Sequence, residues 1–225
     1  MKYHIEFNLE LKKNPYDGLY IAVEGSDASG KTTQVKKLAE YFKSKGKDVI
    51  LTREPRKEGL IGDLVQKILH GKEKVPPVSI QYLFSADRSI NHEEVVIPAL
   101  KKGKVVLSDR CFWSAVVYGI LDKTGGKFDR EVGEYLLLSQ SILSMYHQFT
   151  VPDYTFYLKV TLAESLARLR KKTEVKEIYE DEDKIKPAID GYEYLLERFP
   201  EELVEIDGGK SVQDVTNAMI SKIRS

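Results

Sequence analysis

The sequence predicts an α/β fold in which helices flank a five-stranded parallel sheet. Apolar runs at residues 19–23, 48–52, 104–108, 152–158 and 203–207 alternate with stretches of helical periodicity. This alternation is typical of repeated strand–helix units. The first run leads into a loop bounded by Gly25 and Gly30 and then into a helical pattern. The run at 104–108 is apolar through its centre, as expected for a parallel strand covered on both faces.

The loop after the first strand has the composition of a phosphate-binding P-loop, which predicts the P-loop NTPase fold. It consists of Gly25, Ser26, Asp27, Ala28, Ser29, Gly30, Lys31, Thr32 and Thr33. The two glycines allow backbone geometries in which successive N–H groups surround phosphate oxygens at a helix N-terminus. Lys31 supplies a positive charge for the outer phosphates, and Thr32 supplies a hydroxyl for a magnesium ion. The flanking strand and helix patterns argue against an ordinary glycine-rich turn.

The composition of the chain limits its domain count, its binding partners and its cellular location. The chain has 225 residues, 42% of them hydrophobic, which suffices for one core, and its formal net charge is zero. A nucleic-acid polymer or an anionic membrane therefore meets no global basic field. The single cysteine, Cys111, excludes a disulfide or a cysteine zinc site within the chain. No apolar run approaches the length of a membrane span and the N-terminus lacks a signal-peptide pattern, so we expect a cytoplasmic protein.

An additional strand is expected before the nucleotide-binding core. Residues 1–11 alternate between apolar and polar side chains, and a period of two is typical of a half-buried strand. The turn-forming sequence 14–18 follows. We therefore divide the chain into an N-terminal extension at 1–18 and a P-loop domain at 19–225.

Helical patterns are expected at 31–45, 59–70, 79–101, 129–148 and 186–199, from Thr161 or Glu164 onward, and after Gly209. A loop is expected at 123–127, and the acidic run 180–183 is interpreted as a solvated loop. The pattern at 129–148 is apolar on more than one face. Two explanations stay open for that helix, which are burial against a second subunit and complete burial in the core.

Several polar residues follow the predicted strands and meet at one edge of the sheet. Arg53 comes after the second strand, and Asp109 and Arg110 come after the third. Because ligands bind beyond the carboxyl ends of parallel strands, Asp109 can hold magnesium and Arg110 can bind phosphate there. Phe84 and Arg88 share one helix face and could bind a planar base. On spacing alone, however, a core aromatic and a surface arginine are the stronger interpretation.

Four strings in this order and spacing, EGSDASGKTTQ, REP, FSADR and DRCFWSAVVY, resemble the thymidylate kinase family of nucleoside monophosphate kinases. The resemblance runs from Leu19 to the C-terminus. It implies transfer of the ATP γ-phosphoryl group to dTMP, giving dTDP and ADP, with Mg²⁺ as cofactor. It also implies a homodimer and a lid at about 165–186.

The resemblance assigns roles to individual positions. ATP would be bound by residues 25–33, and magnesium by Thr32 and Asp109. The residues implied in catalysis are Asp27, Lys31, Arg53, Arg110, Arg168 and Arg170. The residues implied in binding dTMP are Arg53, Phe84, Arg88, Arg110, Ser114, Ala115 and Tyr118. Within this set Phe84 would stack on thymine, Arg88 would contact its carbonyl edge, and Tyr118 would crowd a 2′-hydroxyl.

The resemblance implies that the catalytic positive charge comes either from the P-loop or from the lid. One subgroup of the family carries an arginine after the acidic residue of the P-loop, whereas this chain has Ala28. The catalytic cation should therefore come from the lid. Arg168 or Arg170 is expected to supply it, with Lys172 and Lys176 as further candidates. For each residue singly, a solvated helix face is the alternative.

Three positions depart from the resemblance. Cys111 stands where tyrosine is frequent, Ala115 where a polar contact to the base sometimes occurs, and Gly119 where glutamine is frequent. Fewer polar groups would then recognise the base, and we expect dUMP to be accepted along with dTMP. Cys111 is interpreted as a packing residue and not as a nucleophile.

Two other functions were weighed against this one. A related P-loop kinase could act on deoxynucleosides or on another monophosphate, but the paired arginines Arg53 and Arg110 favour a monophosphate acceptor. A slow nucleotide-hydrolysing switch is the second alternative. The chain has no Asn-Lys-x-Asp guanine-reading motif, which disfavours the switch.

Overall fold

The computed structural model describes residues 10–124, 149–171 and 177–223. Its centre is one parallel sheet of five strands in the order β2-β3-β1-β4-β5. The strands are β1 (Leu19–Glu24), β2 (Val49–Arg53), β3 (Val105–Asp109), β4 (Tyr154–Lys159) and β5 (Val204–Asp207). The predicted five-stranded parallel sheet is confirmed.

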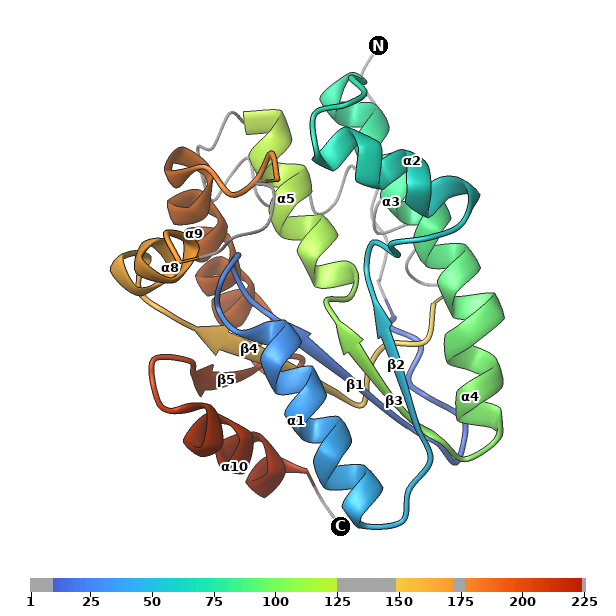
Figure 1. The fold of residues 1–225 in the computed structure, drawn as a ribbon. Coiled ribbons are helices and arrows are strands. Elements are labelled where there is room, and N and C mark those ends of the chain that lie inside the picture. Colours follow the sequence, from blue (N-terminus) through green and yellow to red (C-terminus); the bar gives the residue numbers. More distant parts are fainter. Residues whose placement is uncertain (1–9, 125–148, 172–176, 224–225) are drawn as a thin grey trace.

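Helices cover both faces of this sheet (Figure 1). Their bounds are α1 (Lys31–Ser44), α2 (Leu60–Leu69), α3 (Pro77–Asn91), α4 (Ile97–Lys101), α5 (Phe112–Thr124), α8 (Leu162–Leu169), α9 (Glu182–Arg198) and α10 (Val212–Lys222). A π-helical segment, η1 (His92–Val96), joins α3 to α4. No helix in the described ranges is long and apolar enough to cross a membrane.

Alternate side chains of the strands pack into hydrophobic core layers on opposite faces of the sheet. Ile21 and Val23 of β1 pack with Leu38 of α1 and Met219 of α10. Ala22, between them, packs on the other face with the side chains of α5 and α9. These side chains are almost completely buried, and each layer contributes hydrophobic stabilisation on its own face of the sheet.

The register aligns the carboxyl ends of the strands that matter for function. Val23 and Arg53 both pair with Asp109 across the sheet, and Glu24 pairs with Tyr157. The loops that follow β1, β2 and β3 therefore start from one edge. This register is what brings the P-loop, Arg53 and Arg110 together.

Several predicted helices are present with shifted bounds. The helix expected from residue 186 begins at Glu182 and contains Pro187 in its interior. The helix expected at 79–101 begins at Pro77 and is interrupted by η1. Thr161 caps α8, and a reciprocal capping box with Glu164 marks the helix start. Sequence analysis made no prediction for α5.

Two loop predictions are wrong. The acidic run 180–183 is not a solvated loop, because Glu180 is buried, Asp181 is the N-cap of α9, and Glu182 and Asp183 form its first turn. Acidic side chains there interact favourably with the positive end of the helix dipole. The loop expected at 123–127 begins too early, since α5 continues to Thr124.

Two further predictions concern residues that the structure does not describe. The strand expected at 1–11 lies almost wholly outside the described residues, as does the helix at 129–148. Within the described part of the extension, Lys12 pairs with Thr150 in an isolated parallel bridge, and Asn14 donates to the Asp153 carboxylate at 2.8 Å. The division at residue 18 stays a prediction.

Candidate active site

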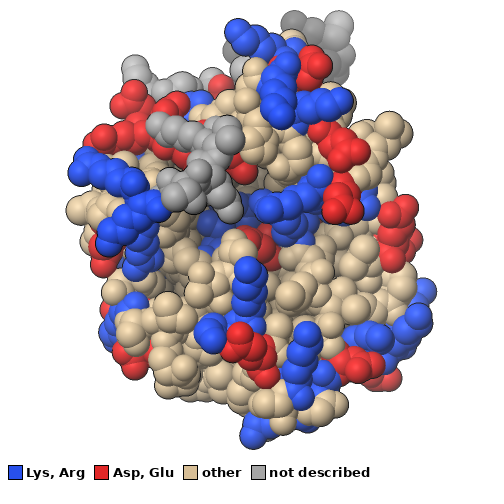
Figure 2. Space-filling model, viewed as in Figure 1, with Lys and Arg blue, Asp and Glu red and all other residues tan. Residues whose placement is uncertain are grey.

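A cavity of about 960 Å³ opens at the carboxyl edge of the sheet. Segments far apart in the sequence line it, including the P-loop, the loop after β2, the end of α2, α3, the start of α5, α8 and residues 177–180. Lysine and arginine side chains surround the hollow above α1 in the space-filling view (Figure 2). A cavity of this size and charge suits large anionic ligands.

The P-loop has the backbone shape expected of a phosphate cradle. Gly25 and Gly30 have φ of 147° and 103°, and Ala28 has φ of 60°. A Cβ on Gly25 would lie 2.6 Å from the Ser29 Oγ, so this position requires glycine. The Ser29 Oγ is buried without a hydrogen-bond partner, and α1 begins directly after Gly30. The N–H groups of this first turn are available for an anion.

Lys31 folds back over the loop. Its Nζ donates to the Gly25 carbonyl at 3.0 Å and to the Ser26 carbonyl at 2.7 Å. Burial, together with the nearby positive charge of Arg110, lowers the pKa of Lys31 to about 8. Phosphate oxygens placed in the loop would favour the charged form of this lysine.

Thr32 and Asp109 meet at the edge of the cavity. The Thr32 Oγ1 donates to the Asp109 Oδ2 at 2.5 Å. A hydroxyl and a carboxylate are hard oxygen donors that fit Mg²⁺, which is usually bound through one or two protein oxygens together with substrate phosphates. The described residues contain no cluster of three or more His, Cys, Asp or Glu side chains that could hold a metal by itself. The donor set therefore fits a nucleotide-bound magnesium ion.

Arg110 lines the cavity beside the P-loop. Its φ of 77° lies in the left-handed region, where an L-residue is strained unless its surroundings hold it. The guanidinium pairs with Asp27 and donates to the Gly25 carbonyl at 3.1 Å and the Tyr118 hydroxyl at 3.4 Å. Its guanidinium carbon lies 5.2 Å from the centre of the Tyr118 ring. These contacts link the P-loop to Tyr118 of α5.

A buried carboxylate that sequence analysis missed supports this arrangement. Glu24 accepts from the backbone N–H of Cys111 at 2.8 Å and of Ser114 at 3.1 Å. Its other oxygen accepts from the Ser114 Oγ at 2.6 Å and the Tyr192 hydroxyl at 2.7 Å. Glu24 thus satisfies N–H groups at the start of α5 and ties that helix to α9.

The cavity lining contains a second buried ion pair. The Arg88 Nε donates to the Glu54 Oε2 at 2.5 Å, and both side chains are buried. Burial raises the pKa of Glu54, although the Arg88 charge opposes this shift. Phe84 lines the same cavity. The spacing-only interpretation of Arg88 as a surface arginine is therefore wrong.

Residues 177–180 close the cavity near Tyr118. The Tyr179 ring packs on the Tyr118 ring with 4.8 Å between centroids, and its hydroxyl donates to Asp122 at 2.7 Å. The Ile178 N–H donates to the Leu69 carbonyl at 3.0 Å. The segment 177–180 therefore joins the end of α2 to α5 at the cavity.

The structure brings together most residues that the sequence analysis named. The cavity is lined by Asp27, Ala28, Gly30, Lys31, Thr32, Thr33, Arg53, Phe84, Arg88, Asp109, Arg110, Ser114, Ala115, Tyr118 and Arg168. Gly25, Ser26 and Ser29 shape the P-loop without lining the cavity. Arg170 is exposed outside it at the C-terminus of α8. Lys172 and Lys176 lie outside the described residues.

Sequence analysis missed Glu24, Glu54, Lys57, Tyr179 and Tyr192. Glu24 and Glu54 stand inside the quoted strings, so a charged residue at a predicted strand end was an available signal. The two tyrosines reach the site only through long-range packing, for which their local sequence carries no signal.

The fold and the site define a P-loop kinase. A phosphate cradle and a separate arginine-containing half share one cavity, which is the arrangement needed to transfer a phosphoryl group between two bound molecules.

Comparison with known proteins identifies the family. The model of the thymidylate kinase family matches residues 23–219. A probable thymidylate kinase from Pyrococcus horikoshii is 32% identical over 92% of this chain and 96% of its own length. A thymidylate kinase from Thermoanaerobacter sp. strain X514 is 32% identical over 92% of this chain and 98% of its own length, and one from Caldanaerobacter subterraneus subsp. tengcongensis is 33% identical over 92% and 95%. The chain belongs to the thymidylate kinase family and is a nucleoside monophosphate kinase.

We expect the Glu24 carboxylate to be a major source of stability. In a Glu24→Met variant two backbone N–H groups and two hydroxyls lose their acceptor, and each buried unsatisfied group costs about 1–3 kcal/mol. Glu24→Gln keeps one oxygen for the N–H groups, so its loss should be smaller, about 1 kcal/mol. Urea unfolding of the wild type and both variants measures the two losses. Equal stability of Glu24→Met and the wild type would contradict this role.

Proposed function

We propose that this chain transfers the γ-phosphoryl group of ATP to dTMP, giving dTDP and ADP. The observation that carries the proposal is the division of one cavity into two phosphate-binding halves. The P-loop with Lys31 forms one half, and Arg53 and Arg110 line the other. Such a cavity suits two nucleotides that meet phosphate to phosphate. The family membership supports dTMP as the acceptor.

On the ATP side, the loop amides and Lys31 would bind the phosphates. Lys31 already lies 2.7–3.0 Å from the Gly25 and Ser26 carbonyls, so it is positioned before the ligand arrives. When bound, a magnesium ion held by Thr32 and Asp109 would neutralise part of the phosphate charge. Phosphoryl transfer depends on positioning and charge neutralisation more than on a strong base.

On the dTMP side, Arg53 and Arg110 would bind the phosphate. Phe84 would stack on the thymine ring, and Arg88, oriented by Glu54, would donate to its carbonyl edge. Tyr118 is buried and packed against Tyr179. Its fixed ring would crowd a ribose 2′-hydroxyl and so favour deoxynucleotides.

The reaction is tested by a coupled assay of ADP formation with and without dTMP. We expect ADP release to accelerate when dTMP is added, because the acceptor half must be filled for transfer. A slow-hydrolysing switch would show the same rate in both cases. Absence of dTMP-dependent turnover, with ATP bound, would therefore refute the kinase assignment.

We expect the enzyme to accept dUMP as well as dTMP. Ala115 lines the cavity but offers no polar side chain to the base, and a methyl group alone discriminates by roughly 10- to 200-fold. The ratio of kcat/KM for the two acceptors measures this. A preference for dTMP above roughly a thousandfold would exceed what one methyl contact supplies and would contradict the prediction.

The lid cation is expected to be Arg168. Its Nη1 donates to the Ser29 carbonyl at 3.1 Å and its Nη2 to the Gly208 carbonyl at 2.8 Å, which places the guanidinium beside the P-loop. Arg168→Ala should lower kcat by about a thousandfold, as for loss of an arginine that stabilises transferring phosphate. Arg170→Ala, at the exposed end of the same helix, is the matched control and should leave kcat near wild type.

Thermal unfolding of both arginine variants checks that the folded state persists. Near-wild-type kcat in both would refute the lid assignment. A loss confined to Arg170→Ala would transfer the role to that residue.

The resemblance also implies a homodimer, and the lack of a membrane-span or signal-peptide pattern in the sequence predicts a cytoplasmic protein; we retain both as parts of the proposal. Among the described residues, the large hydrophobic side chains Leu60 and Tyr82 are exposed by 86% and 55% on α2 and α3. Light scattering should give twice the chain mass of 25.7 kDa. We further propose residues 165–186 as the lid.

A further inference from the structure

The acceptor half of the cavity holds fewer unpaired positive charges than its arginines suggest. Arg88 is paired with Glu54 at 2.5 Å, and Arg110 is paired with Asp27 and shared with Tyr118. Each carboxylate neutralises a charge that an incoming phosphate dianion would otherwise meet. Further cations facing this half therefore decide how tightly the acceptor phosphate can be held.

The ATP half draws on its own cations. Lys31 donates to two carbonyls of the P-loop, and Arg168 donates to the Ser29 and Gly208 carbonyls. Both side chains are thereby directed to the P-loop side of the cavity.

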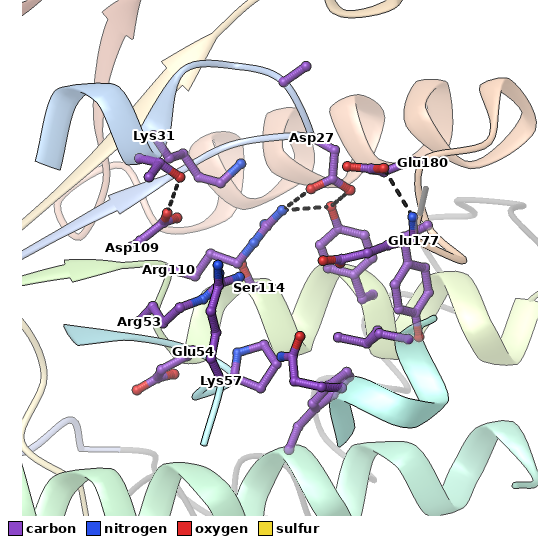
Figure 3. Close-up of a pocket in the computed structure, with 18 of the residues that line it drawn as sticks. Asp27, Lys31, Arg53, Glu54, Lys57, Asp109, Arg110, Ser114, Glu177 and Glu180 are labelled. Carbon is purple, nitrogen blue, oxygen red and sulfur yellow. Dashed lines mark hydrogen bonds and ion pairs between the residues drawn. The ribbon is translucent and has the colours of Figure 1, made fainter. Parts of the chain in front are cut away.

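Two lining cations fall outside these contacts, Arg53 and Lys57. No carboxylate among the described residues lies within ion-pair distance of either, and the Arg53 Nε is buried without a hydrogen-bond partner. Lys57 is exposed and lies four residues beyond Arg53 in the loop after β2. In Figure 3 its side chain extends into the cavity on the side where Arg53 and Arg110 lie.

The neighbouring residue fixes the loop that presents Lys57. The Arg56 Nε pairs with Asp87 of α3 at 2.9 Å, its Nη1 pairs with Glu94 of η1 at 3.1 Å, and its backbone N–H donates to Asp87 at 2.7 Å. Asp87 is completely buried. The loop is thus anchored on α3 and η1 by Arg56, which leaves Lys57 facing the cavity.

We propose that Lys57 binds the phosphate of the acceptor nucleotide together with Arg53. The inference rests on the proposed function and adds a residue to its acceptor site. A lysine ammonium is a compact charge with three donors that suits a phosphate dianion. Because Lys57 is solvent-exposed before binding, its ammonium group is accessible to an incoming phosphate.

Calorimetric titration of dTMP into Lys57→Met and the wild type tests the proposal. Loss of a charge-assisted contact should raise the Kd for dTMP roughly tenfold to a hundredfold. The Kd for ATP should not change, and neither should that for thymidine, which lacks the phosphate. Lys57→Arg should restore most of the dTMP affinity. Lys67→Met, which removes an exposed lysine of α2 outside the cavity, is the matched control and should bind as the wild type does.

The outcomes separate this inference from the proposed function. If the wild type binds dTMP and Lys57→Met binds it equally well, Lys57 has no such role and the proposed function stands. An equal loss of ATP and dTMP affinity in Lys57→Met would also overturn the inference, since the lysine would then not be specific to the acceptor. If the wild type does not bind dTMP at all, the proposed function fails and the inference falls with it.

Discussion

The geometry of the site depends on one buried carboxylate at the end of the strand that leads into the P-loop. Glu24 accepts hydrogen bonds from the start of α5 and from Tyr192 of α9. A buried carboxylate without partners would be costly, so the chain must bring these donors to it. Arg110, directly before those N–H groups, is thereby held in its left-handed conformation beside the P-loop. The two phosphate-binding halves are therefore built from one hydrogen-bonded unit.

The charges that line the cavity are nearly balanced, although the proposed ligands are two polyanions. Six cationic side chains line the cavity (Lys31, Arg53, Lys57, Arg88, Arg110 and Arg168) against five carboxylates (Asp27, Glu54, Asp109, Glu177 and Glu180). The ion pairs keep the buried guanidinium groups from standing uncompensated in the absence of ligand. Incoming phosphates then add negative charge to a cavity that has little positive excess. Cations without a carboxylate partner should therefore contribute more to phosphate binding than the paired cations do.

Sequence alone predicts the parts of this molecule that are governed by local physics. The five strands follow from apolar runs, and the P-loop follows from two glycines, Lys31 and Thr32. The capped start of α8 follows from Thr161 and Glu164. The predictions that fail depend on tertiary contacts. Glu180 was assigned to a solvated loop because its neighbours are acidic, whereas its side chain is buried and accepts from the Glu177 N–H at 3.0 Å.

The same distinction applies to the site. Spacing places Phe84 and Arg88 on one helix face but does not reveal that Glu54 lies opposite Arg88. Likewise, nothing local to Tyr179 or Tyr192 indicates that they meet Tyr118 and Glu24. These contacts join positions 34 to 168 residues apart along the chain, and the hydrogen bond between Tyr192 and Glu24 spans the longest interval. Only the folded sheet, with its strand ends in register, brings such pairs into one cavity.

The two described ends of the proposed lid contact different halves of the cavity. At the start of the lid, Arg168 is bonded to the P-loop through the Ser29 carbonyl. Beyond residue 176, Ile178 is bonded to the end of α2, and Tyr179 packs on Tyr118 in the acceptor half. A displacement of either end must therefore alter contacts in its own half, and the chain between them joins the two. The proposed lid is therefore one continuous segment whose described ends contact both halves of the cavity.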